Sequence, residues 1–87
     1  MKQIWKYDVH DGSIRMPIGA KILSVQLQNN RPMMWAIVDP NAETEIRKFE
    51  IVGTGMGFND TDYMYTYIGT FQDNPFVWHL FEWNDKK

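Results

Sequence analysis

The chain has 87 residues, a length typical of one domain, and its formal net charge of −2 is close to neutral. Because it has no cysteine, a disulfide framework, a thiolate zinc site and a cysteine nucleophile are all excluded. The near-neutral charge disfavours a nucleic-acid-binding protein, since such proteins usually carry an excess of basic surface. We therefore expect a single domain over residues 1–87 that does not bind nucleic acid.

The composition and the N-terminus also bear on stability and location. Aromatic residues make up 15% of the chain, which helps a small core to close. Association of identical chains would bury further apolar surface, so a homo-oligomer stays open. The N-terminal residues lack the apolar stretch of a signal peptide, and no apolar run reaches the roughly 18 residues of a membrane span. We therefore expect a cytoplasmic protein that does not contact a membrane.

The N-terminal third of the chain predicts three strands. Over residues 3–9, Trp5 and Tyr7 fall on one face and charged residues on the other, which is the alternation of a strand. Residues 10–13 predict a turn, and residues 13–16 a short second strand. The clearest strand covers residues 20–28, where we expect Leu23, Val25 and Leu27 to face the core.

The middle of the chain predicts two further strands. Residues 29–32 predict a tight turn, and residues 33–39 a returning strand that is apolar on both sides, hence central and covered on both faces. Residues 43–53 predict a strand, because branched and aromatic residues gather at its end. A short helix beginning near Asn41 is the alternative for this segment.

The C-terminal part predicts a long loop and two last strands. Residues 54–66 lack a clear period, and a stretch of this length inside a small domain is either functional or mobile. Strands are predicted over residues 67–72 and 76–83, joined by a turn at 73–75. With little room for a helix, the fold class is all-β: a small antiparallel barrel or sandwich of six to seven short strands.

A glycine-rich segment is the first candidate site. Gly53, Thr54 and Gly55 invite comparison with phosphate-binding loops, in which glycines let several backbone N–H groups converge on an anion. Such loops normally lead directly into a helix, and the residues that follow give no helical start. Flexible glycines at the end of a strand are the plainer interpretation, and a nest without a helix is the functional one.

Several other side chains could complete a ligand site. Arg47 precedes the glycines on the same strand, and its guanidinium suits phosphate or carboxylate. Tyr63, Tyr65 and Tyr67 form an alternating row that could stack on a base, form a protein-binding surface or simply belong to the core. His79 lies on an aromatic strand and could contact a ligand, although a core-edge histidine with a hydrogen-bond partner is the plainer interpretation.

Catalytic and metal-binding patterns are weak. Asp60 and Asp62 have the spacing of a calcium loop, but the other ligands of that motif are missing. The two serines, Ser13 and Ser24, do not lie in a nucleophile elbow. We therefore expect no catalytic activity, no resident metal and no cofactor.

The chain resembles a family of small uncharacterised proteins from bacteriophages and prophage-carrying bacteria. The resemblance spans nearly the whole chain and rests on these segments: Ile4-Trp5-Lys6-Tyr7, Met16-Pro17, residues 19–26, Gln28-Asn29, Trp35-Ala36, Val38-Asp39-Pro40, Arg47-Lys48-Phe49, Gly53-Thr54-Gly55, residues 67–72 and residues 76–82. It implies a phage setting in the cytoplasm of a bacterial host, and it implies no functional residues, because the family is one of unknown function. The chain departs from the family pattern after the glycines, where the loop is longer.

Two binding functions follow from these observations. In the first, the protein is a host-defence antagonist that sequesters a small anionic, nucleotide-like signal between the glycine segment, Arg47 and the tyrosines. In the second, it is a protein-interaction module that inhibits a host protein, such as a defence protein, through an aromatic surface.

Overall fold

The computed structural model describes residues 1–58 and 64–84, which form seven β-strands and no helix. The strands are β1 (Gln3–Asp8), β2 (Ser13–Pro17), β3 (Lys21–Gln28), β4 (Arg31–Val38), β5 (Thr44–Gly53), β6 (Tyr65–Asp73) and β7 (Phe76–Trp83). The predicted all-β fold class is confirmed. The segment for which a short helix was the alternative is the longest strand, β5.

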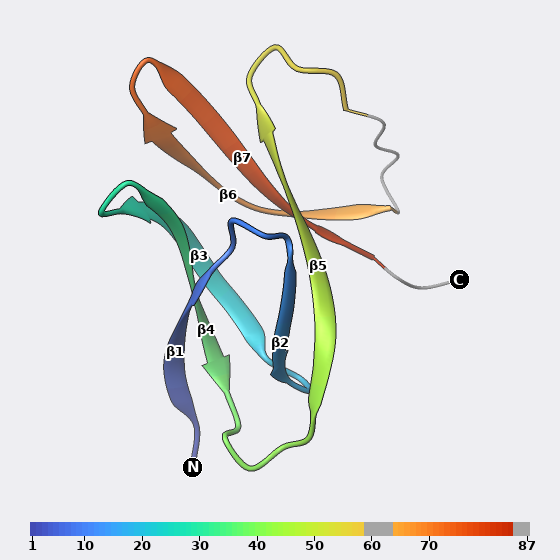
Figure 1. The fold of residues 1–87 in the computed structure, drawn as a ribbon. Helices are drawn as coiled ribbons and strands as arrows, with labels where there is room; N and C mark the ends of the chain where they lie inside the picture. The colour runs from blue at the N-terminus through green and yellow to red at the C-terminus, as the bar shows by residue number, and fades with distance from the viewer. Residues whose placement is uncertain (59–63, 85–87) are drawn as a thin grey trace.

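The strands form two antiparallel sheets that face each other as a sandwich (Figure 1). One sheet has the order β1-β4-β3, and the other has the order β2-β5-β7-β6. The sheets approach each other most closely where β3 lies against β6, and there a side-chain atom on Gly69 would stand 3.1 Å from Val25 Cγ1. Of the two expected architectures, the sandwich is therefore observed and the closed barrel is not.

The core lies between the sheets and is built from the inward-facing residues of both. The buried apolar cluster contains Val9, Ile14, Met16, Ala20, Val25, Met34, Ala36, Val38, Phe49, Phe71 and Leu80. Val25, Met34 and Ala36 come from the three-stranded sheet, and Phe49, Phe71 and Leu80 from the four-stranded one. Alternation along each strand explains this division, since every second side chain points to the same face.

The turn between β3 and β4 lies where the sequence predicts it but is two residues shorter, because Arg31 and Pro32 already belong to β4. Asn29 and Asn30 both have positive φ angles, 52° and 66°, which is the geometry of a two-residue hairpin turn that Asn tolerates well. The predicted central place of the following strand is also confirmed, because β4 lies between β1 and β3.

Two expectations about the three-stranded sheet are wrong. Leu23 does not share the inward face with Val25, because the β3–β4 register shifts between Ile22 and Ser24, and Leu23 is 42% exposed. The bulge adds one residue and so reverses the alternation. The second wrong expectation is that β4 is covered on both faces. Its outward side is only partly covered, by the stem of Lys6, which crosses it from β1 to β3 and donates from Nζ to Gln28 Oε1 at 2.7 Å.

The segment after β5 also differs from the expectation of a loop over residues 54–66. The last strand residue of β5 is Gly53, and β6 begins at Tyr65, two residues before the predicted start at Tyr67. Within the ranges that the structure describes, no helix is long and apolar enough to cross a membrane.

Candidate functional site

The outward side of the β5–β7–β6 sheet gathers most of the chemistry-bearing residues. Because Leu80 is buried in the core, its neighbours His79 and Phe81 on β7 point to the opposite side, away from the sandwich interior. The register places Thr70 of β6 opposite His79, and Tyr67 opposite Phe81. Residues from two strands therefore meet on one surface.

A β-bulge in β6 makes this meeting possible. The β6–β7 register shifts between Tyr67 and Gly69, so one extra residue separates Tyr67 from Thr70. In a regular strand, residues three apart would point to opposite faces. The bulge reverses the alternation and brings both side chains to the outward side.

Aromatic rings cover one end of this surface. Phe58, from the segment that follows β5, has its ring centroid 4.7 Å from that of Phe81 and 4.9 Å from that of Tyr65. Tyr65 contacts Trp83 at 5.1 Å, and Tyr67 contacts Phe81 at 5.5 Å. We call these five residues the aromatic face.

The rings of the aromatic face are not equally exposed. Tyr67 is 56% exposed, whereas the other four are partly buried against one another. Val52, which lies opposite His79 in the β5–β7 register, is 7% exposed although it lies outside the main core. The aromatic face thus consists of a packed base with one projecting ring.

A chain of hydroxyl groups and one imidazole runs beside the rings. Thr54 Oγ1 lies 2.7 Å from His79 Nε2, and Thr70 Oγ1 lies 3.0 Å from His79 Nδ1. The Tyr67 hydroxyl lies 2.5 Å from Thr70 Oγ1. Each ring nitrogen therefore has a hydroxyl partner, and the exposed tyrosine is held at the end of what we call the hydroxyl–imidazole chain.

The hydroxyl–imidazole chain resembles a catalytic arrangement only in part. A threonine hydroxyl within hydrogen-bond reach of a histidine is the geometry of an activated nucleophile. In a catalytic triad the other ring nitrogen contacts a carboxylate, which stabilises the positive imidazole. Here that place is taken by the hydroxyl of Thr70. What this arrangement does best is to fix side-chain orientations.

Thr54, Tyr65 and His79, three of the predicted site residues, lie on this outward side. Thr54 contacts His79 directly, and Tyr65 belongs to the aromatic face, where its hydroxyl donates to Glu50 Oε1 at 2.8 Å. Gly55 follows Thr54 in the exposed turn after β5, where its φ of +91° suits glycine. Tyr63 lies outside the described residues.

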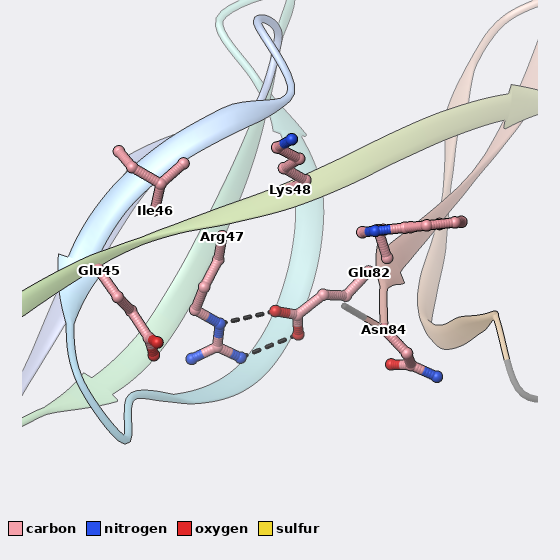
Figure 2. A pocket seen from close by; sticks show the side chains of 7 residues that line it. Glu45, Ile46, Arg47, Lys48, Glu82 and Asn84 are labelled. Carbon is pink, nitrogen blue, oxygen red and sulfur yellow. Dashed lines mark hydrogen bonds and ion pairs between the residues drawn. The ribbon is translucent and has the colours of Figure 1, made fainter. Parts of the chain in front are cut away.

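Arg47 lies on the other face of β5, where its side chain points toward that of Glu82 on β7 (Figure 2). Its Nε and Nη2 donate to the two oxygens of Glu82 at 2.6 and 2.9 Å, and its Nη1 donates to the carbonyl of Ala20 at 2.6 Å. These hydrogen bonds to the Glu82 carboxylate raise the pKa of Arg47. The guanidinium is thus already paired with an anion of the same chain.

The backbone of the glycine segment is also engaged within the protein. The N–H groups of Thr54 and Met56 donate to the carbonyls of Val77 and Gly53, both at 3.0 Å. Gly53 is buried, and a side-chain atom there would stand 2.9 Å from Met56 Sδ and 3.0 Å from the Trp78 ring. Glycine is needed at this position because two side chains pack on it.

Phe58, Thr70, Phe81 and Trp83 belong to this surface but were not predicted as site residues, whereas Tyr67 is part of the predicted row of tyrosines. Alternation along the last strand could have identified Phe81 and Trp83 as neighbours of His79. Thr70 could not be found by alternation alone, because a bulge turns it outward; Gly69, a glycine inside a strand, is the signal that could have indicated this bulge. Within residues 1–58 and 64–84, no group of three His, Asp or Glu side chains could hold a metal ion.

Comparison with protein families gives a match along the whole chain. The model described as Domain of unknown function (DUF7352) matches residues 1–87. No curated protein and no solved structure matches the chain.

Proposed function

The chain belongs to this family of unknown function, and from its geometry we propose that it is a non-catalytic module that binds another protein through the aromatic face. One observation carries the proposal: Tyr67 projects with 56% of its surface exposed, yet its hydroxyl is bonded to Thr70 and its ring contacts Phe81. The most exposed ring of the cluster is thus also held in place.

Protein interfaces favour this arrangement for energetic reasons. Tyrosine and tryptophan dominate the residues that contribute most to binding, and they cluster at the centres of interfaces. A side chain that is already ordered loses less conformational entropy on binding, and that loss otherwise costs about 0.5–1.5 kcal/mol per side chain. Tyr67, backed by Phe81 and the hydroxyl–imidazole chain, meets both conditions.

Paired variants test the proposal. Tyr67→Ala removes the projecting ring. Phe76→Ala removes a ring of similar exposure, 58%, at the first residue of β7, away from the aromatic face. Wild type and both variants are immobilised and used to capture proteins from a bacterial lysate, with quantitative mass spectrometry and with circular dichroism to verify folding. We expect a protein that wild type and Phe76→Ala retain equally and that Tyr67→Ala loses by about 30-fold, the effect of a strong interface residue.

A third variant tests the role of pre-ordering. Thr70→Val keeps the shape of residue 70 but removes the hydroxyl that holds Tyr67 and contacts His79. With the captured partner, its affinity should fall about three- to tenfold, less than for Tyr67→Ala. If wild type, Tyr67→Ala and Phe76→Ala capture the same proteins equally, the aromatic face is not the binding surface. The same holds if Tyr67→Ala binds the captured partner with full affinity.

The alternative, sequestration of a small anion, has less support. It needs a cation and free backbone donors, whereas Arg47 is paired with Glu82 and the N–H groups of Thr54 and Met56 bond within the chain. An anion at this place would have to compete with a carboxylate already held by two hydrogen bonds.

The biological setting of the proposal comes from the resemblance to bacteriophage proteins. In that setting the partner would be a bacterial host protein, for instance one that acts in defence against phages, and the module would act in the host cytoplasm. Binding to a host protein requires neither a cofactor nor a reaction.

A further inference from the structure

A concave surface lies at one end of the sandwich, away from the aromatic face. Its rim is formed by His10 of the β1–β2 loop, Asn30 of the β3–β4 turn and Asp73 at the end of β6, segments that lie toward the same end of the molecule in Figure 1. We call this surface the end hollow; it has a volume of about 440 Å³ and is lined by His10, Leu27, Asn30, Pro32, Ile51, Phe71, Asp73 and Trp78.

The floor of the end hollow is apolar and aromatic. Phe71 and Trp78 are directly opposite each other in the β6–β7 register, and Ile51 of β5 lies beside them. Leu27 and Pro32, from the other sheet, face them across the hollow. The hollow is therefore the open mouth of the core, where the two sheets no longer cover each other.

The end hollow carries a negative charge and no positive one from a lysine or arginine among its described lining residues. Among the described residues that line the end hollow, Asp73 is the side chain with a formal charge, and His10 and Asn30 add polar groups at the rim. Asp73 lies opposite Phe76 in the register, and the Phe76 ring packs 5.8 Å from that of Trp78. A carboxylate thus stands at the edge of an aromatic and apolar floor.

We propose that the end hollow binds a small organic cation, a quaternary or protonated amine on a compact apolar body. Aromatic faces attract such cations through their quadrupole, and a nearby carboxylate adds Coulomb attraction. The apolar methyl groups of such a ligand would bury against Leu27 and Ile51. An anionic ligand would meet Asp73 without a lysine or arginine among the described lining residues to offset it.

This site is separate from the protein-binding surface proposed above. Trp78 and His79 are adjacent on β7 and therefore point to opposite faces of the sheet, so the end hollow and the aromatic face lie on different sides. Failure of one proposal leaves the other unaffected.

Choline and its uncharged isostere 3,3-dimethylbutan-1-ol provide the test. Each is titrated into the full chain, and binding is followed by NMR at the indole N–H of Trp78 and the side-chain amide of Asn30, with Tyr67 as a remote reference. We expect choline to shift the two hollow signals and not that of Tyr67, and to bind at least about tenfold more tightly than the isostere.

Two variants separate charge from shape. Asp73→Asn keeps the size of the side chain and should reduce choline affinity to that of the isostere. Asp39→Asn, in the turn between β4 and β5, removes the same charge outside the hollow and should leave choline binding unchanged. The proposal fails if choline gives no shift at about 10 mM, tenfold above a weak dissociation constant of about 1 mM. It also fails if the isostere binds equally, or if Asp73→Asn binds choline as wild type does.

Discussion

Arg47 and Glu82 form an ion pair with two parallel hydrogen bonds although they are 35 residues apart in the chain. The side chains are each only 18% exposed, and the third nitrogen of Arg47 bonds to the carbonyl of Ala20. One guanidinium therefore joins β5, β7 and the connection between β2 and β3. It acts as a structural link between parts of the fold that share no turn.

Removal of this ion pair should be costly. Glu82→Gln leaves the mostly buried Arg47 without its counter-charge, and we expect the free energy of unfolding to fall by about 2 kcal/mol. Arg31→Gln is the control, because Arg31 pairs with Asp8 but is 60% exposed, and an exposed pair contributes at most about 1 kcal/mol. Urea unfolding followed by tryptophan fluorescence measures both. Equal losses for the two variants would contradict the structural role of Arg47.

Tyr7 should make stability sensitive to alkaline pH. Within the described residues its hydroxyl is buried without a hydrogen-bond partner, and burial raises the pKa of Tyr7 above 10.0. Below pH 10 the phenol is neutral in both the folded and the unfolded chain. Above that pH the unfolded chain ionises first, so the free energy of unfolding decreases as the pH rises from 10 through the folded pKa of Tyr7.

Tyr7→Phe removes both the buried hydroxyl and its ionisation at high pH. At neutral pH we expect it to be as stable as wild type or more stable by about 1 kcal/mol, because it removes a buried group without a partner. Near pH 11 the advantage of the variant over wild type should grow. Tyr67→Phe, at an exposed ring, is the matched control and should keep the alkaline loss. Urea unfolding at the two pH values measures the difference, and an advantage that does not change with pH would exclude Tyr7 as its source.

Gly69 should not accept a side chain, because it lies where the two sheets meet. A Cβ atom there would stand 3.1 Å from Val25 Cγ1, and Val25 is only 4% exposed. We expect Gly69→Ala to lower the free energy of unfolding by about 1 kcal/mol through overpacking. Gly57→Ala, with no atom within 4 Å of the new Cβ, is the control and should have little effect.

A double-mutant cycle gives the decisive measurement. In a Val25→Ala background the new methyl group of Gly69→Ala has room, so its cost should largely disappear. If Gly69→Ala costs the same in both backgrounds, the close approach of β3 and β6 at this point is not what excludes a side chain.

The fold was predictable where alternation and turn residues agree. The strand around Val25, the Asn29–Asn30 turn and the inward face of β7 at Leu80 all follow from the local sequence. The bulge at Leu23 was not predictable, because a single extra residue in a strand leaves the composition unchanged and only shifts the register. For the bulge after Tyr67, Gly69 inside the strand is a signal that alternation alone does not use.

The site was predictable only in part, because its contacts join distant segments. Thr54 and His79 were both identified as candidates, but their contact depends on β5 and β7 being neighbours, which strand patterns alone do not determine. The partner of Arg47 could not be predicted for the same reason, because it also lies on β7. A cation that seemed available for a ligand is paired with Glu82, which follows it by 35 residues.

The strand order also determines when each part of the chain finds its partner during synthesis. β1 and β2 pair with β4 and β5, so Gln3 meets Val38 and Ser13 meets Lys48. At about 5–20 residues per second, each waits roughly 2 to 7 seconds for its partner to leave the ribosome. Ile14 and Met16, buried in the finished core, are without cover during that time. The N-terminal strands are therefore where a chaperone would first be useful to the nascent chain.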